Sequence, residues 1–418
     1  MSKKNPLAIY VPPGTIIEGR FLFETLAVGR YSTIFKVEDK LDYRRKYCIK
    51  VEYDRAHKIN YLHQEITVLH KLATRDHMAR LYYSERCDQF SFMLITLFGK
   101  SIWLLRQNLP NKLLSPGSVA RIAVHTLYQI KQIHEVGYIL RDLKIGDMLV
   151  GLSGKRTKMV FLVDFGMCRT YIRKDPNGSI TIRPPRKKVF VHGILRYCSP
   201  RVHKRHDVCR ADDLWSLVYV LIDLTAGLPW RDIKLEIPVA EQKETITDAK
   251  LFSNCPEEWI KIMEHVRSLH YESRPNYKLI YDCLRETLIR FQVSYSDPWD
   301  WDLVGNDVII EEGSKEEVSS SESKSKKLNK SDFQQTGMET DHSRWNNSEN
   351  QNFIAQDLPT TSSFENVPAA QRKTEVMPQA KNPFKEIIST LQNSLPFVPM
   401  TSSDQKSSAL SAKLFHNF

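Results

Sequence analysis

The chain has 418 residues, 41% of them hydrophobic, so it is long enough to bury the core of one large domain or two smaller ones. Its formal net charge of +11 favours anionic partners: phosphate esters, acidic peptides, nucleic acid or a membrane surface. Seven cysteines without a CxxC pair argue against a disulfide framework or a zinc ribbon. No run reaches the roughly 20 apolar residues of a membrane span, and the N-terminus lacks the apolar region of a signal peptide. We therefore expect an intracellular protein, in the cytoplasm, the nucleus or both.

The first part of the body predicts a sheet with one helix. The runs FLFETLAVGRYSTIFKVEDK and RRKYCIKVEYD alternate as β-strands do, and the second contains Lys50. The next run, NYLHQEITVLHKLA, has Leu62, Ile66, Leu69 and Leu72 at the spacing of a helix. Two further strand-like runs follow, RLYYSER and FSFMLITLFG.

From Ser118 onward the pattern is mainly helical. SVARIAVHTLYQIKQIHEVG and DDLWSLVYVLIDLTAG have the length of buried helices, and a short strand-like run, VFLVDFGM, lies between them. Strands with one helix, followed mostly by helices, predict an α+β fold with a small β-rich lobe and a larger α-rich lobe.

The composition changes after Asp302. Residues 303–418 are rich in Ser, Asn, Gln and Thr, and they lack the apolar density that offsets the entropy of ordering, so we expect this tail to be mostly disordered. One stretch differs: residues 383–395 place apolar side chains at helical spacing between Pro383 and Pro396. It is either a helix that docks in the groove of a partner or a short apolar run with transient helicity.

Four features in a fixed order carry the candidate chemistry. Lys50 lies on a predicted strand and Glu65 on the helix after it. LRDLKIGD then supplies Asp142 and Lys144, and VFLVDFGM supplies Asp164. Each feature is weak alone, since Lys50 and Glu65 could equally form a surface salt bridge. Their order and matching local structure point to phosphoryl transfer.

Over residues 21–291 the sequence resembles the eukaryotic protein kinases, in their casein kinase I group and most of all in the tau-tubulin kinase branch. The finer resemblance rests on YCIKVE, RPPRKK, RADDLWSL, GLPWRDIK, and GILRYCSP where most kinases have Ala-Pro-Glu. It implies the bilobal protein-kinase fold, with a small antiparallel β lobe and one main helix, then a larger helical lobe. The expected boundaries are an extension at 1–20 and a kinase domain at 21–302, divided into a small lobe at about 21–95, a hinge at 96–99 and a large lobe at 100–302.

The resemblance implies that ATP is bound by the small lobe and the hinge. Lys50 would hold the α- and β-phosphates, with Glu65 orienting it. The glycine-rich loop is thinned to LAVGRYSTI, which weakens the signal for a nucleotide site. The other implied ATP contacts are small loop residues, an apolar strand residue and the hinge, namely Ala27, Gly29, Ser32, Ile34, Thr96 and Leu97.

The resemblance also implies a transfer site for the γ-phosphoryl group. Asp142 would be the catalytic base that accepts the proton of a substrate hydroxyl, and Lys144 would bind the γ-phosphate. Asp164 and Asp147 would be ligands of Mg²⁺, or of Mn²⁺ if the second carboxylate shifts the ion preference. Asp213 would hold the backbone of the catalytic loop by hydrogen bonds.

Two positions in YILRDLKIGDMLVG depart from the family pattern. Leu140 replaces the usual His and can fill its apolar role. Asp147 replaces the usual Asn; it either binds the second metal ion or no longer binds metal at all. The first hypothesis is an active serine/threonine kinase. The alternative is a pseudokinase scaffold that binds partners through its body and tail with little turnover.

The segment after Asp164 is rich in Arg and Lys. It is either a solvated basic loop or, as we favour, a site for acidic or already phosphorylated protein substrates, because Arg binds phosphate in a bidentate manner. No interleaving of aromatic and basic residues appears, which argues against nucleic acid as a partner. The predicted anion-binding residues are Arg183, Arg186, Lys187, Lys188 and Arg196.

Overall fold

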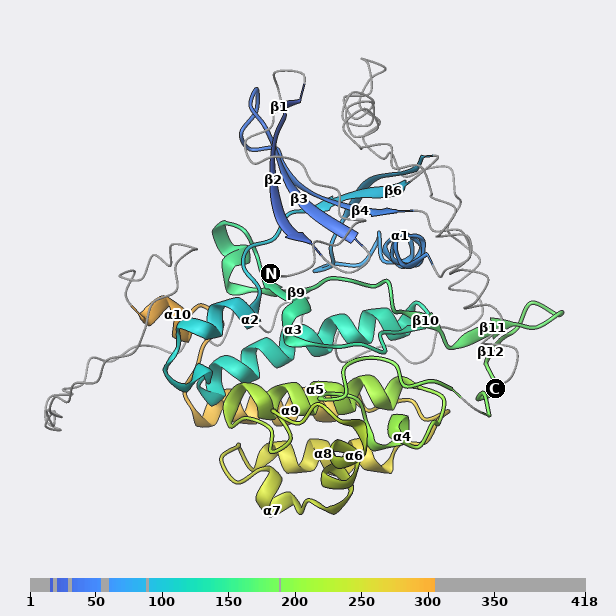
Figure 1. The fold of residues 1–418 in the computed structure, drawn as a ribbon. Coiled ribbons are helices and arrows are strands. Elements are labelled where there is room, and N and C mark those ends of the chain that lie inside the picture. Colours follow the sequence, from blue (N-terminus) through green and yellow to red (C-terminus); the bar gives the residue numbers. More distant parts are fainter. Residues whose placement is uncertain are drawn as a thin grey trace, which may run out of the picture. The chain divides into compact units, whose positions relative to one another are not determined.

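The computed structural model describes residues 16–17, 21–28, 32–53, 60–87, 90–187 and 189–304. These residues form two compact units (Figure 1). One contains the described residues up to Gly99 together with Val163–Cys168, and the other contains Lys100–Leu162 and the chain from Arg169 onward. The predicted tail beyond residue 304, its helix at 383–395, Gly29 and Lys188 lie outside the described residues.

The first unit contains an antiparallel sheet of six strands. Neighbouring strands in sequence pair with one another, except that β6 lies between β4 and β5. The strands, in their order across the sheet, are β1 (Ile16–Ile17), β2 (Phe21–Val28), β3 (Ser32–Asp39), β4 (Lys46–Tyr53), β6 (Phe90–Thr96) and β5 (Leu81–Arg86). The sheet confirms the strand pattern predicted from the alternating runs.

The two faces of this sheet differ. On one face Phe35 of β3, Ile49 of β4 and Leu94 of β6 lie opposite one another within a hydrophobic cluster. Because successive strand residues point to opposite faces, Lys50 is turned away from this cluster. Other members of the cluster are Phe23, Val37, Val51, Phe90 and Phe92.

Helix α1 (Tyr61–Lys71) of the same unit begins at a side-chain cap, because the oxygen of Asn60 accepts the N–H of His63 at 2.8 Å. The buried face of α1 carries Leu62, Val68 and Leu69, and Glu65 lies among them. A carboxylate on an apolar face is costly unless it is paired. The helix therefore holds Glu65 where a cationic partner is needed.

The second unit is mainly helical, as predicted. Helix α3 (Pro116–Glu135) packs against α5 (Arg210–Thr225) and α9 (Tyr277–Arg290), and α8 (Glu258–Ser268) packs against the same two helices (Figure 1). Helix α5 is buried along almost its whole length, so it forms the centre of this core. The shorter helices are α2 (Ile102–Leu105), α4 (Pro200–His203), α6 (Glu236–Thr245), α7 (Asp248–Leu251) and α10 (Asp300–Leu303).

Short strand pairs of this unit bound the segment that carries Asp142. Strand β7 (Tyr138–Ile139) pairs with β10 (Arg169–Thr170), and β8 (Met148–Val150) pairs with β9 (Val160–Leu162). The segment that carries Asp142 therefore leaves one paired strand, β7, and enters another, β8. The remaining short elements are the hairpin β11 (Ile172–Lys174) and β12 (Ile180–Ile182), and the 3₁₀ turns η1 (Arg106–Asn108), η2 (Pro110–Lys112), η3 (Ile145–Asp147) and η4 (Gly154–Lys158).

The last described residues fold back on α3. The guanidinium of Arg121 donates to the carbonyls of Tyr295 and Asp297 and lies 3.8 Å over the ring of Trp299. The carboxylate of Asp300 accepts the hydroxyls of Ser115 and Ser118 at 2.8 and 2.9 Å. These contacts fix the chain just before the change in composition after Asp302.

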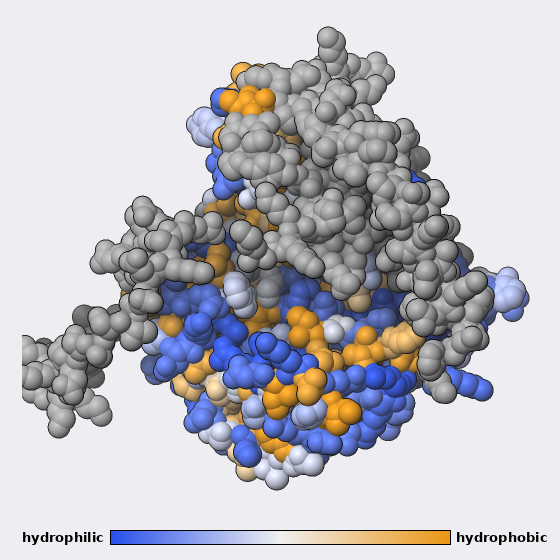
Figure 2. Space-filling model, in the orientation of Figure 1, coloured by the Kyte–Doolittle hydropathy of each residue, from blue (hydrophilic) through white to orange (hydrophobic). Residues whose placement is uncertain are grey.

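The surface of the second unit mixes hydrophilic and hydrophobic areas on the face shown in Figure 2. Its exposed apolar side chains include Phe190, Ile194, Leu235 and Ile237. Within the described ranges, no helix has both the length and the apolar composition needed to cross a bilayer.

Candidate active site

Lys50 is the centre of a charged group within the first unit. Its Nζ lies 2.7 Å from Oε2 of Glu65 and 2.8 Å from Oδ1 of Asp164. The side chains of Lys50 and Glu65 are 12% and 2% exposed, so this is a buried ion pair and not a surface salt bridge. Burial by itself lowers the pKa of Lys50, but attraction to Glu65 and Asp164 outweighs it and raises that pKa above the usual value. The amine is therefore held charged.

The predicted ATP contacts of the sheet line up with Lys50. Lys50 of β4 lies opposite Ile34 of β3, and Ile34 lies opposite Ala27 of β2. Residues paired in this way share one face of the sheet, here the face turned away from the hydrophobic cluster. Ser32 begins β3 and is half-buried. The sheet thus places a fixed positive charge beside small and apolar side chains.

The Asp164-Phe165-Gly166 turn closes this group. Asp164 adopts a left-handed backbone conformation, with φ of 66°, which is uncommon for a residue other than glycine. Phe165 is buried, and its N–H donates to the carboxylate of Glu65. A Cβ on Gly166 would lie 3.1 Å from atoms of Tyr61, at the start of α1, so a larger residue would crowd the helix. Sequence motifs identified Asp164, but not its direct bond to Lys50.

The predicted hinge contacts lie at the end of β6. Thr96 and Leu97 are both buried. The Oγ1 of Thr96 accepts the N–H of Arg80 at 2.9 Å, so this hydroxyl also ties β6 to the start of β5. The first continuous stretch of the first unit ends two residues beyond Leu97, at Gly99.

The second unit contains the other charged group, made of Asp142, Lys144 and Asp147. The Nζ of Lys144 lies 3.0 Å from Oδ2 of Asp142 and 2.5 Å from Oδ2 of Asp147. The three side chains are partly exposed. One lysine thus bridges the predicted base and the residue that replaces the family Asn. Asp147 keeps the Lys144 amine close to Asp142, a contact that the sequence did not predict.

Asp213 fixes the backbone of the loop that carries Asp142. Its Oδ2 accepts the N–H of Leu140 at 2.8 Å, and its Oδ1 accepts the N–H of Arg141 at 2.9 Å. Nε2 of His134 lies 2.8 Å from the same Oδ2, and Nδ1 of His134 lies 2.7 Å from the hydroxyl of Tyr277. Leu140 itself is buried, which agrees with its predicted apolar role.

A second segment approaches Asp142 from residues 193–199. The N–H of Ile194 donates to Oδ1 of Asp142 at 3.1 Å. Gly193 has φ of 80°, and a Cβ there would lie 2.6 Å from the carbonyl oxygen of Arg141. Only glycine meets both requirements, so the glycine of GILRYCSP was the sequence signal for this contact.

The predicted anion-binding arginines are bonded to groups of the chain itself. The Nε of Arg183 donates to the carbonyl of Ile172 at 3.0 Å, and the guanidinium of Arg196 donates to the carbonyl of Arg231 at 2.7 Å. Arg186 forms a bidentate pair with Asp207. Lys187 is exposed. Their binding of substrate anions stays a prediction.

Asp207 was missed by the sequence reasoning. It is 4% exposed in its side chain and also lies 3.5 Å from the guanidinium of Arg169. Although burial acts in the opposite direction, the hydrogen bonds from Arg186 lower the pKa of Asp207 below its usual value. Part of the positive charge in this segment is therefore neutralised inside the molecule. The only sequence signal was a single acid within the basic run HKRHDVCR.

The carboxylates of Asp164 and Asp147 are suited to a metal ion that is bound together with a nucleotide. Across the described ranges, no cluster of three or more His, Cys, Asp or Glu residues is arranged to hold a metal ion. Mg²⁺ in phosphoryl-transfer sites is commonly bound by one or two carboxylates, water and substrate phosphates. Asp164 and Asp147 each offer hard oxygen donors of this type. The donor chemistry therefore fits a divalent ion shared with phosphate.

Comparison with known proteins identifies relatives of most of the described chain. A model of the protein kinase domain matches residues 22–287. A Caenorhabditis elegans protein provisionally named as a serine/threonine-protein kinase is 33% identical, over 69% of this chain and 84% of that protein. Another, provisionally named as a casein kinase I, is 30% identical over 72% and 89% of the two chains. A third from the same organism, named as an inactive tau-tubulin kinase, is 30% identical over 56% and 83%.

Proposed function

The chain belongs to the protein kinase family and to its casein kinase I group, and from this premise we propose how it acts as a serine/threonine kinase. It transfers the γ-phosphoryl group of ATP to hydroxyls of acidic or phosphorylated proteins. The observation that carries the proposal is the bonding of Lys50 to both Glu65 and Asp164. A buried amine held charged at this position is suited to the phosphates of ATP.

Within the first unit, Lys50 binds the α- and β-phosphates and Glu65 keeps its amine in place. Ala27, Ser32 and Ile34 would lie beside the adenine and phosphates, with Thr96 and Leu97 at the edge of the base. Asp164 would hold Mg²⁺, which when bound neutralises charge on the phosphates. Lys50 and Asp164 are bonded to one another, so each orients the other.

In the second unit, Asp142 accepts the proton of the substrate hydroxyl. Its Oδ1 accepts the N–H of Ile194 and its Oδ2 lies 3.0 Å from Nζ of Lys144, so both carboxylate oxygens are held in place. Lys144 stabilises the negative charge of the transferred phosphoryl group. Asp147 orients Lys144 and would supply a carboxylate to a second Mg²⁺ or Mn²⁺ ion. Asp213 holds the loop so that none of these groups has to reorganise during transfer.

The substrates are acidic or already phosphorylated proteins. The net charge of +11 and the basic segment containing exposed Lys187 support this preference. Arg186 pairs with Asp207, and the guanidinium of Arg196 lies 4.0 Å from the carboxylate of Asp223, so these two arginines offer less positive charge to a substrate. Lys187, Lys188 and Arg183 therefore carry more of the proposed preference. The seven cysteines form no disulfide, which supports a reducing location, the cytoplasm or the nucleus.

Transfer of ³²P from ATP to peptides tests the proposal. Three peptides would share one serine and differ in flanking residues: acidic, acidic with an upstream phosphoserine, and basic. We expect transfer to the first two with Mg²⁺ or Mn²⁺, and little to the third. Equal transfer to all three would contradict the substrate preference, and no transfer to any, with either metal, would contradict the kinase activity.

The second candidate function is a pseudokinase scaffold. It is favoured by Asp147 and by the relative named as an inactive tau-tubulin kinase. It predicts that ATP raises the melting temperature of the protein while no peptide is phosphorylated. Both charged groups retain their lysines and carboxylates, and for this reason we place active transfer first.

A further inference from the structure

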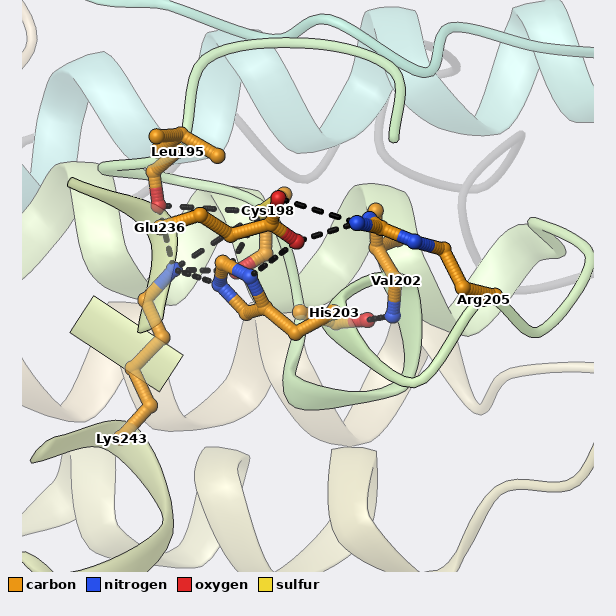
Figure 3. Close-up of polar contacts among 8 residues, drawn as sticks. Leu195, Cys198, Val202, His203, Arg205, Glu236 and Lys243 are labelled. Atoms are coloured by element: carbon orange, nitrogen blue, oxygen red, sulfur yellow. Dashed lines mark hydrogen bonds and ion pairs between the residues drawn. The ribbon is translucent and has the colours of Figure 1, made fainter. Parts of the chain in front are cut away.

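A buried lysine, Lys243, lies outside both charged groups. Lys243 on α6 is 7% exposed, and no Asp or Glu of the described ranges forms an ion pair with it. Its Nζ lies 2.6 Å from the carbonyl oxygens of both Leu195 and Cys198 and 3.3 Å from Nε2 of His203 (Figure 3). Leu195 and Cys198 belong to the 193–199 segment, and His203 lies on α4, the helix that follows it.

The surroundings of Lys243 match an ammonium ion. An ammonium has three N–H donors, and Leu195, Cys198 and His203 offer three acceptors if the proton of His203 is on Nδ1. Glu236 favours that tautomer, because its Oε1 lies 3.5 Å from Nδ1 of His203. The aromatic rings of Tyr219 and Trp230 also lie near the amine, with centroids 5.0 and 5.5 Å from Nζ.

Packing alone does not explain this lysine. Burying a cation without a carboxylate is costly, and a methionine would fill a similar volume without that cost. The bonds that Lys243 makes are to backbone carbonyls and not to another charged side chain. The effect of Lys243 is therefore to hold the backbone conformation of residues 195–198.

That conformation is coupled to Asp142. Leu195, held by Lys243, directly follows Ile194, whose N–H donates to Oδ1 of Asp142 at 3.1 Å. The carbonyl between the two lysine contacts, that of Arg196, accepts the indole N–H of Trp230 at 2.9 Å. Carbonyls of three of the four residues from 195 to 198 are thus fixed from outside the segment.

We propose that Lys243 is a positioning residue for phosphoryl transfer, which holds the 193–199 segment so that the Ile194 N–H stays on Asp142. The inference rests on the proposed kinase function for its effect on catalysis. Its structural part, the anchoring of residues 193–199, is independent of that function.

The same geometry predicts a dependence on pH. Burial lowers the pKa of Lys243 to about 8, against attraction from Cys198. The groups facing the amine are the Cys198 thiol, the His203 imidazole and the Tyr219 ring, with Glu236 and Arg205 beyond His203. As pH rises through about 8 the amine loses its third donor. In the unfolded chain the amine keeps its proton to higher pH, so a rise in pH above about 8 increases the free energy of unfolding. The same rise weakens the hydrogen bonds that hold residues 195–198.

Lys243→Met in the full chain, beside Lys250→Met at an exposed lysine of α7, tests the proposal. We expect Lys243→Met to lower kcat about ten- to a hundredfold, with KM for ATP unchanged, because small errors in position are costly for transfer. Its melting temperature should equal or exceed that of the unsubstituted protein, and Lys250→Met should change neither quantity. Above pH 8 the unsubstituted protein should lose activity, whereas the residual activity of Lys243→Met should not fall in that range.

Hydrogen exchange of the backbone amides separates failure of this inference from failure of the proposed function. We expect faster exchange at residues 193–199 in Lys243→Met and no change in Lys250→Met, whether or not the protein phosphorylates peptides. Unchanged exchange in Lys243→Met, or an unchanged kcat in an otherwise active protein, would overturn the proposal. An unsubstituted protein that transfers no phosphate would contradict the kinase function, and the exchange result would still decide the anchoring.

Discussion

The two charged groups are built in different ways. Lys50, Glu65 and Asp164 are joined to one another directly, and the pair at its centre is buried between a strand and a helix. Asp142, Lys144 and Asp147 lie close together on one loop, where Lys144 bridges the two carboxylates, and they depend on Asp213 and Ile194 for their placement. The first group is therefore held mainly by its buried ion pairs, and the second by its ion pairs together with hydrogen bonds that join its loop to Ile194 and Asp213. Substitutions within the first group should therefore disturb it directly. The second group should also be disturbed by substitutions of the residues that hold its loop, such as Asp213.

Among substitutions that test how the two groups are held, the largest effect is expected from Lys50→Met, which removes the centre of the first group. Transfer should fall about 10²–10³-fold, because a preorganised cation for the phosphates is lost. ATP should no longer raise the melting temperature. Lys46→Met on the same strand, where the lysine pairs with Glu38, is the matched control and should keep both properties. Comparable activity of the two variants would mean that Lys50 does not bind ATP.

Asp213→Asn tests whether the second group depends on its support. The amide has only one oxygen for three donors, those of Leu140, Arg141 and His134, so a buried donor loses its partner. The free energy of unfolding should fall by about 1–3 kcal/mol. Transfer should fall by roughly tenfold or more, since the Asp142 loop loses its anchor.

Chemical denaturation and peptide phosphorylation at a temperature where the variant is folded separate the two effects. Asp232→Asn, at an exposed position in the same unit, is the control. If Asp213→Asn is destabilised but transfers phosphate at the normal rate, the loop does not depend on this anchor.

Asp147→Asn restores the residue that is usual in the family. It tests whether the extra carboxylate of Asp147 binds a metal ion. Removal of one negative charge should raise the half-saturating Mg²⁺ concentration by about three- to tenfold, if Asp147 is a metal ligand. The measurement is the metal dependence of transfer with Mg²⁺ and with Mn²⁺. Identical dependence in both proteins would mean that Asp147 acts only on Lys144.

The smallest effect on activity is expected from Asp300→Ala, which touches neither group. It removes the acceptor of the Ser115 and Ser118 hydroxyls at the start of α3. The free energy of unfolding should fall by about 1 kcal/mol. Thermal melting measures this, while kcat at a temperature well below the transition should be unchanged. A large loss of kcat would mean that the end of the domain influences the site.

The sequence predicted what depends on local pattern. Alternation and helical spacing gave the sheet and the long helices, and motif order gave Lys50, Glu65, Asp142 and Asp164. It did not predict the Lys50–Asp164 bond, which depends on the left-handed conformation of Asp164. It also did not predict the contact of Lys243 with Leu195, 48 residues away, because this contact joins a helix to a loop whose position is set by the packing of other elements.

The basic segment shows the same limit. Composition predicted a set of cations open to anionic substrates, because charge can be counted from sequence. The pairing of Arg186 with Asp207 could not be counted in this way, since it depends on a fold that brings together residues 21 positions apart. The prediction of acidic substrates therefore stands on fewer residues than the sequence suggested.

The most direct test of the account is the rate of phosphoryl transfer by Asp142→Asn measured beside its affinity for ATP. The account predicts that transfer falls about 10²–10⁴-fold, the usual contribution of a general base. It also predicts that the rise in melting temperature caused by ATP is unchanged, because Lys50, Glu65 and Asp164 are intact. Equal transfer by the variant and the unsubstituted protein would contradict the role of Asp142 and, with it, the proposed kinase mechanism.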